Sequence, residues 1–227
     1  SLAFGTEVDA EAVHVEGIES ISLADLEAAD ELGYRVKLLG VAQRTEGGIE
    51  QRVHPTMVRQ GTVIAEVDGV INAVAVDADT MELTLMGPGA GGAATASAVV
   101  ADLMDLAGGR RVPAFGRPAA ALTKPQRAPM QRHEGGYYIR LTVVDRPGTA
   151  ATIARRMADE KISLESIMQH GRDRRPHGGE DPRVDKPALV VLITYATTED
   201  AVRRALAAIE QDGVWVEKPQ VIRIEKS

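Results

Sequence analysis

Cysteine is absent from the 227 residues of this chain, and aromatic side chains make up only 3% of it. Without thiols the chain cannot form disulfides, thiolate metal sites or a cysteine nucleophile. This composition fits a reducing compartment, so we expect a cytoplasmic protein. The scarcity of aromatic rings argues against a surface on which nucleic-acid bases stack. No apolar run approaches the roughly 20 residues of a membrane-spanning helix, so we expect no membrane partner.

Basic residues are also fewer than acidic residues: the chain has 26 Lys and Arg and 33 Asp and Glu, which give a formal net charge of -7. A nucleic-acid-binding protein needs a basic face, so we expect no nucleic-acid partner. Hydrophobic residues at 44% and charged residues at 26% are typical of a globular protein. The histidines are scattered, and no pair has the i, i+4 spacing of a helical zinc site, so we assign no metal ligand.

Acidic residues are concentrated in the first half of the chain. Residues 1–118 contain 18 acidic and 8 basic residues, whereas residues 137–227 contain 14 and 15. The stretch 119–136 contains prolines, glycines and little apolar periodicity, which is typical of a linker. We therefore predict a first domain over residues 1–118, a linker over 119–136 and a second domain over 137–227.

Helix and hairpin signals alternate in the first domain. Ser22 and Asp25 form a variant capping box, which predicts a helix over residues 23–32 whose acidic positions, Asp25 among them, face solvent. Four strands are predicted, at residues 34–43, 49–54, 70–77 and 81–86, and Pro55 is expected to end the second because proline cannot donate to a ladder. An apolar helix with small residues along one face is predicted over residues 93–106, and we expect it to be buried against another element of the fold. These elements predict an α+β domain, with a mixed or antiparallel sheet and helices on one face.

A glycine-rich stretch at residues 87–92 follows the last of these strands and precedes the apolar helix. It contains Gly-x-Gly-x-x-Gly, but a Rossmann fingerprint also needs a second strand ending in an acid about 20 residues later, and none follows. Two interpretations remain open. The loop lets backbone N–H groups approach a ligand, or it is only a tight turn that brings the helix against the sheet.

The second domain shows the order βαββαβ. Its strands are expected at residues 137–144, 162–170, 188–195 and 214–224, and its helices at 149–160 and from Thr197 onward. The last strand is interrupted at Pro219, and residues 171–186 read as a long polar loop. This order predicts a ferredoxin-like fold, in which an antiparallel sheet carries two helices on one face.

The turn Asp145-Arg146-Pro147-Gly148 joins the first strand of this domain to its first helix. Pro147 stops the strand, and Gly148 leaves room for a ligand to reach the first free N–H groups of the helix, which favour a carboxylate. Asp145 could hold the ligand's ammonium group, and Gln169 could bond its side chain or a partner subunit. The alternative is that the turn only connects a strand to a helix and binds no ligand.

Together, these motifs resemble one enzyme family. The first domain resembles the C-terminal part of the catalytic domain of homoserine dehydrogenase, through residues 1–5 (Ser-Leu-Ala-Phe-Gly), 31–34, 37–39, 53–56 (Val-His-Pro-Thr), 69–73 (Gly-Val-Ile-Asn-Ala), 87–92 and 95–100. The second domain resembles an ACT domain, a small-molecule sensing module, through residues 145–148, 162–164 and 167–169. The resemblance extends over nearly the whole chain.

The resemblance implies NAD(P)-dependent interconversion of homoserine and aspartate semialdehyde, on the route to threonine and methionine. It implies that the Rossmann domain and the catalytic Lys precede Ser1, so we assign no catalytic residue and expect this chain alone to be inactive. It also implies cofactor contact by Gly89, Ala90 and Gly91 in the full-length enzyme, threonine as the feedback effector, and a homodimer or tetramer. A stand-alone amino-acid-binding regulatory protein remains the alternative.

Overall fold

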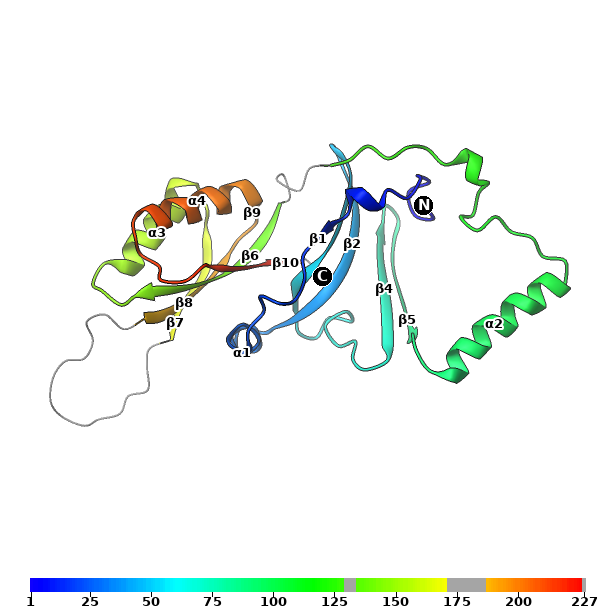
Figure 1. Ribbon diagram of the computed structural model, residues 1–227, viewed down its shortest axis with the longest axis horizontal. Coiled ribbons are helices and arrows are strands. Elements are labelled where there is room, and N and C mark those ends of the chain that lie inside the picture. The colour runs from blue at the N-terminus through cyan, green and yellow to red at the C-terminus, as the bar shows by residue number, and fades with distance from the viewer. Residues whose placement is uncertain (129–133, 171–186, 226–227) are drawn as a thin grey trace.

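Figure 1 shows a computed structural model of the chain, which describes residues 1–128, 134–170 and 187–225. The predicted loop over 171–186 lies outside the described residues. The elements, in chain order, are η1 (Ala10–Ala12), β1 (His14–Val15), α1 (Leu23–Glu31), β2 (Tyr34–Thr45), β3 (Gly48–Arg59), β4 (Ile71–Ala78), β5 (Met81–Pro88), α2 (Gly92–Ala107), η2 (Ala119–Ala121), β6 (Glu134–Val144), α3 (Thr149–Asp159), β7 (Leu164–His170), β8 (Pro187–Thr194), β9 (Thr197–Thr198), α4 (Glu199–Gln211) and β10 (Gln220–Ile224).

One mixed sheet runs through both halves of the chain, in the order β1-β3-β10-β6-β8-β7, with β2 paired to β3. The last strand, β10, makes this possible because it pairs antiparallel with β6 and parallel with β3. The predicted α+β class, with a mixed sheet, is confirmed. The continuity of the sheet across the two halves was not predicted, since the ferredoxin-like pattern gives no reason for its last strand to pair outside the second domain.

The strand predicted to end at His54 is longer, and the expectation that Pro55 terminates it is wrong. β3 continues to Arg59, and Pro55 lies opposite Leu38 of β2. The carbonyls of Val53 and Met57 accept hydrogen bonds from the β1 and β10 side of the strand. Backbone groups point alternately to the two sides of a strand, so the nitrogen of Pro55, two residues from each of these, also points to the β1 and β10 side. It lies between the residues that pair with β1 and those that pair with β10, and the hydrogen bonds to β2 need no N–H from Pro55.

Helices α3 and α4 pack on one face of the β6-β8-β7 sheet, as the βαββαβ order predicted (Figure 1). Both helices are strongly amphipathic, and the core between helices and sheet consists of Tyr137, Ile139, Leu141, Val143, Ile153, Met157, Ile162, Ala188, Val190, Leu192, Ala201, Val202, Ala205, Leu206 and Ile209. The start of α4 differs by one residue from the prediction. The side chain of Thr198, and not that of Thr197, accepts the capping hydrogen bond, from the N–H of Ala201.

Helix α1 covers the opposite face of the same sheet. Its buried alanines join residues of both halves in what we call the α1 cluster: Ala28, Ala29, Tyr34, Met57, Tyr138, Val191, Ile193 and Ile222. The capping box predicted at Ser22 is confirmed, but the prediction that Asp25 faces solvent is wrong, since its exposed fraction is 0%. The reason is that β6 supplies Arg140 and Tyr138, whose side chains satisfy the Asp25 carboxylate inside the interface.

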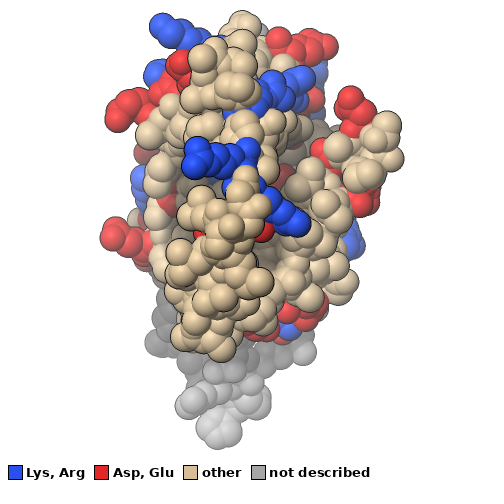
Figure 2. Space-filling view, turned by 90° about the vertical axis from the view of Figure 1, so that its right-hand side faces the viewer, with Lys and Arg blue, Asp and Glu red and all other residues tan. Residues whose placement is uncertain are grey.

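Strands β4 and β5 form a separate two-stranded sheet, followed by α2 (Figure 1). The expectation that α2 is buried is wrong for this chain, because no residue of α2 is buried. Every residue of α2 except Ala94 is exposed. Figure 2, which faces this end of the molecule, shows uncharged side chains over the lower centre of the view, below several Lys and Arg side chains. The exposed large apolar residues of β4, β5 and α2 are Val74, Val76, Met81, Leu83, Leu85, Met86, Val99, Val100, Leu103, Met104 and Leu106.

The stretch predicted as a linker contacts the first half of the chain where it is described. Thr123 forms a bridge with Thr6, and Arg127 forms one with Ile49. Residues 134–136 belong to β6. The predicted domain limits at residues 118 and 137 remain predictions, since the sheet itself does not mark a boundary there.

Candidate functional site

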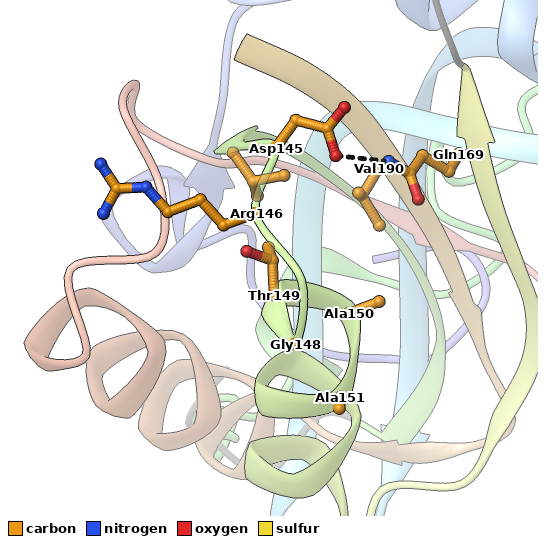
Figure 3. Close-up of a pocket in the computed structure, with 9 residues that line it drawn as sticks. Asp145, Arg146, Gly148, Thr149, Ala150, Ala151, Gln169 and Val190 are labelled. Atoms are coloured by element: carbon orange, nitrogen blue, oxygen red, sulfur yellow. Dashed lines mark hydrogen bonds between the residues drawn. The ribbon is translucent and has the colours of Figure 1, made fainter. Parts of the chain in front are cut away.

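The turn between β6 and α3 borders a cavity of about 270 Å³ (Figure 3). Its walls come from the end of β6, the first turn of α3 and the neighbouring strands β7 and β8, and consist of Val143, Asp145, Arg146, Gly148, Thr149, Ala150, Ala151, Gln169 and Val190. This volume lies just below the range of roughly 300–1,000 Å³ that is typical of sites for drug-sized ligands. The cavity therefore suits a small metabolite.

Gly148 gives the turn its shape. Its φ of 95° is in the left-handed region that side chains disfavour, and it is the N-cap of α3. A Cβ built at Gly148 would meet no atom within 4 Å, so the space beside it is open. The first turn of a helix leaves N–H groups without partners inside the helix, and the cap residue here has no side chain that could satisfy them. The N–H of Thr149 donates to the carbonyl of Arg146 at 3.1 Å, so the donors that this terminus offers to an anionic group at the cavity are those of the next residues, Ala150 and Ala151.

Asp145 and Gln169 face each other across the cavity mouth. The Gln169 Nε2 donates to the Asp145 Oδ1 at 3.5 Å, the dashed contact in Figure 3. Both side chains are exposed, so a ligand can replace this long contact without leaving a buried group unsatisfied. The Arg146 side chain points away from this pair (Figure 3), and Pro147 is not among the lining residues. Four of the five residues predicted for a regulatory ligand thus meet at one cavity.

Five lining residues were not predicted: Val143, Thr149, Ala150, Ala151 and Val190. Thr149 and the two alanines could have been found, because they form the first helical turn directly after Gly148. The Thr149 hydroxyl donates to the carbonyl of Val144 at 2.9 Å and so fixes the turn against the end of β6. Val143 and Val190 depend on the pairing of β6 with β8, which sequence alone does not reveal.

The predicted cofactor residues Gly89, Ala90 and Gly91 lie between β5 and α2, on the other side of the molecule from this cavity (Figure 1). A Cβ at Gly89 would collide with the side-chain amide of the exposed Asn72, which would then have to turn aside. Gly91 has a φ of 107° and open space beside it. Asn72, which was not predicted as a site residue, packs directly against this loop.

Buried charges also join the two halves of the chain. Arg140 donates to both carboxylate oxygens of Asp25, at 2.6 Å and 3.2 Å, and the Tyr138 hydroxyl donates to the same carboxylate at 3.0 Å. Burial opposes ionisation of Asp25, but the hydrogen bonds from Arg140 and Ser22 outweigh it and hold the pKa of this carboxyl below its ordinary value. Asp25 is therefore ionised at neutral pH.

A second set of charges lies along the pairing of β3 with β10. Arg52 is wholly buried and bonds Glu50 and Glu225, while Arg223 of β10 donates to Glu16 at 2.9 Å and to Glu199 at 2.7 Å. Burial opposes ionisation of Glu16, yet the hydrogen bonds from Arg223 and His14 lower its pKa to about 2. These contacts tie β10 and the start of α4 to the first half of the chain.

In the described parts of the chain, no group of three or more His, Asp or Glu side chains is arranged to hold a metal ion. None of the described helices is long and apolar enough to cross a membrane.

Comparison with known proteins gives two family matches. Residues 1–104 match the homoserine dehydrogenase family, and residues 137–213 match the ACT domain. Homoserine dehydrogenase of Neisseria gonorrhoeae is 41% identical over 234 residues, which cover 99% of this chain and 51% of that protein. Homoserine dehydrogenase of Pseudomonas aeruginosa is 39% identical over 217 residues, covering 92% of this chain and 48% of that protein.

Solved structures of homoserine dehydrogenases share the fold of this chain. A homoserine dehydrogenase from Thiobacillus denitrificans superposes with a TM-score of 0.84 at 38% identity, over 99% of this chain and 50% of that one. Staphylococcus aureus homoserine dehydrogenase superposes with a TM-score of 0.65 at 22% identity, which supports the fold alone. The chain spans about half the length of the relatives it matches. By these matches the chain belongs to the homoserine dehydrogenase family over residues 1–104 and carries an ACT domain over residues 137–213.

Proposed function

We propose that the cavity between β6 and α3 binds a free α-amino acid as a regulatory effector. The observation that carries this proposal is the open space beside Gly148, at a helix terminus that has no capping side chain. An α-carboxylate fits the N–H groups of the first turn of α3, and the Asp145 carboxylate is an acceptor for the α-ammonium group. Gln169 and the apolar walls from Val143 and Val190 then contact the effector's side chain.

We infer threonine as the effector. Its side chain carries one hydroxyl and one methyl group, which suit an amide beside valines, and the small cavity disfavours longer side chains. Threonine is also the end product of the route that the family resemblance implies. The stand-alone regulatory protein considered from the sequence would use the same cavity, so this part of the proposal does not depend on dehydrogenase activity.

Calorimetry tests the site. We expect the chain to bind threonine, to bind isoleucine, methionine and lysine more weakly, and to lose binding in Gly148→Glu, because a carboxylate then fills the anion site. Gly109→Glu is the matched control, since Gly109 also has a positive φ of 74° and open space beside it but follows α2, far from the cavity. Absence of heat with every amino acid, or unchanged binding in Gly148→Glu, would remove the site.

We propose further that the chain is part of an NAD(P)-dependent homoserine dehydrogenase, acting on homoserine and aspartate semialdehyde in the cytoplasm. The family matches and the thiol-free composition support this. In the longer enzyme, Gly89, Ala90 and Gly91 would lie beside the dinucleotide, where the main chain at Gly91 and the start of α2 are open. The assignment of Gly89, Ala90 and Gly91 rests mainly on the family resemblance.

A homodimer or tetramer is part of the same proposal. Many large apolar residues of β4, β5 and α2 are exposed, and large apolar patches on a protein surface mark contact sites. The second half adds β7, which is the edge strand of the long sheet. An uncovered edge of this kind is a ready template for pairing with another chain.

A further inference from the structure

We propose that helix α1 transmits the binding of an amino acid in the β6–α3 cavity to the homoserine dehydrogenase part of the chain, and that the Asp25–Arg140 ion pair enables it to do so. This inference rests on the effector site proposed above and concerns its regulation. Three features of the molecule support it: the position of the cavity relative to α1, the geometry of the ion pair, and the attachment of α1 to β2 and β3.

The cavity and α1 lie on opposite faces of the same three-stranded region. Side chains alternate between the two faces of a strand, so neighbouring residues serve both sides. On β8, Val190 lines the cavity and Val191 belongs to the α1 cluster. On β7, Gln169 lines the cavity and Met168 packs against the α1 cluster. A ligand that moves either strand by a fraction of an ångström therefore changes the surface on which α1 packs, because cores are close-packed.

The Asp25–Arg140 ion pair fixes the position of α1 relative to β6. Arg140 bonds both oxygens of Asp25, and a bidentate pair holds its partners in one relative orientation. Three residues after Arg140, the same strand β6 reaches Val143 at the cavity wall. A shift of β6 must then either carry α1 with it or break a pair whose carboxylate is wholly buried, which is energetically unfavourable.

Helix α1 is in turn fixed to the strands of the first half. The N–H of Gln60, just after β3, donates to the carbonyl of Gly33 at 2.9 Å, and the Gln60 amide donates to Asp30 at 2.8 Å. β2 begins at Tyr34 and pairs with β3 along its whole length. A displacement of α1 thus reaches the region matched by the homoserine dehydrogenase family, to which α1, β2 and β3 belong.

Hydrogen exchange with and without saturating threonine tests the proposal. In the wild type we expect the amides of α1, residues 23–31, to exchange about fivefold more slowly with threonine, the lower end of usual coupling between sites. The amides of residues 71–88 in β4 and β5 serve as an internal control and should not respond. The double variant Asp25→Asn, Arg140→Met removes both charges together and should keep threonine affinity while losing the α1 response.

Two milder variants keep the test decisive if the double variant does not fold. Tyr138→Phe leaves the ion pair in place and should retain the α1 response. Arg140→Lys keeps the charge but not the two-pronged geometry and should lose it. Threonine heat in calorimetry without any α1 response in the wild type, or an undiminished response in the double variant, would overturn the role of α1 and leave the effector site standing. Absence of threonine heat would overturn both.

Discussion

Replacement of Arg140 by methionine should strongly destabilise the chain. Methionine preserves much of the volume and removes the guanidinium, so the Asp25 carboxylate loses its charged partner while it stays wholly buried. Removal of one partner from a buried ion pair typically destabilises a protein by about 3–5 kcal/mol, because an uncompensated charge remains inside. The pair here is closed to solvent on the Asp25 side and 15% exposed at Arg140.

The expected loss lies at the lower end of that range. Asp25 keeps three other donors, the Ser22 N–H at 2.8 Å, the Ser22 hydroxyl at 2.6 Å and the Tyr138 hydroxyl at 3.0 Å. Hydrogen bonds to a charged group contribute about 1.5–3 kcal/mol each and soften the loss of Arg140. We therefore expect the free energy of unfolding to fall by about 3 kcal/mol. The double variant Asp25→Asn, Arg140→Met should recover at least about 1 kcal/mol of this loss, since no buried charge is left.

Urea unfolding followed by tryptophan fluorescence is the assay. The chain has one tryptophan, Trp215, which packs against the core of the ACT domain and so reports on the unfolding of that part. Arg110→Met is the matched control, because Arg110 pairs with Asp105 at 3.3 Å on the surface, where both side chains are more than half exposed. Exposed pairs contribute about 0–1 kcal/mol. Equal effects of Arg140→Met and Arg110→Met, or strictly additive effects in the double variant, would refute the reasoning.

Three further predictions concern pH, assembly and activity. His54 is wholly buried, and burial lowers its pKa, so below pH 6.5 the unfolded chain binds a proton that the native protein does not. The free energy of unfolding should therefore fall toward pH 5 by up to about 1.4 kcal/mol per pH unit, and urea titrations of His54→Gln should show a smaller fall. Light scattering at micromolar concentration should give at least a dimer, because the apolar faces of β4, β5 and α2 are open; a clean monomer would contradict this. The 227-residue chain alone should show no homoserine-dependent reduction of NAD(P) in a spectrophotometric assay, and measurable turnover by pure material would disprove it.

Local patterns predicted most of the elements because their causes are local. The capping box at Ser22, the alternation in β6 and the amphipathic helices α3 and α4 follow from spacing over a few residues. The turn at residues 145–148 was predicted for the same reason, since proline and glycine act on their own backbone. The failures concern partners that lie far away in the sequence.

Asp25 and Pro55 illustrate those failures. Asp25 looks like a solvent-facing helix position, and only Arg140, 115 residues later, explains its burial. Pro55 looks like the end of a strand, and only the positions of β1 and β10 on the same side of β3 explain why its missing N–H is tolerated. For α2 the pattern correctly indicated an apolar side, but it could not indicate that no described part of this chain would cover it.

The glycines of the two candidate sites differ in their surroundings. At Gly89 a Cβ would meet only the exposed side chain of Asn72, and Gly91, the N-cap of α2, has a positive φ and open space beside it. At Gly148 a side chain would meet no neighbouring atom, and the positive φ gives the only internal reason for glycine. Both helix termini are uncapped and open, but only the one at Gly148 borders a cavity that Asp145 and Gln169 also line, and this combination makes the cavity between β6 and α3 the stronger candidate for a ligand site.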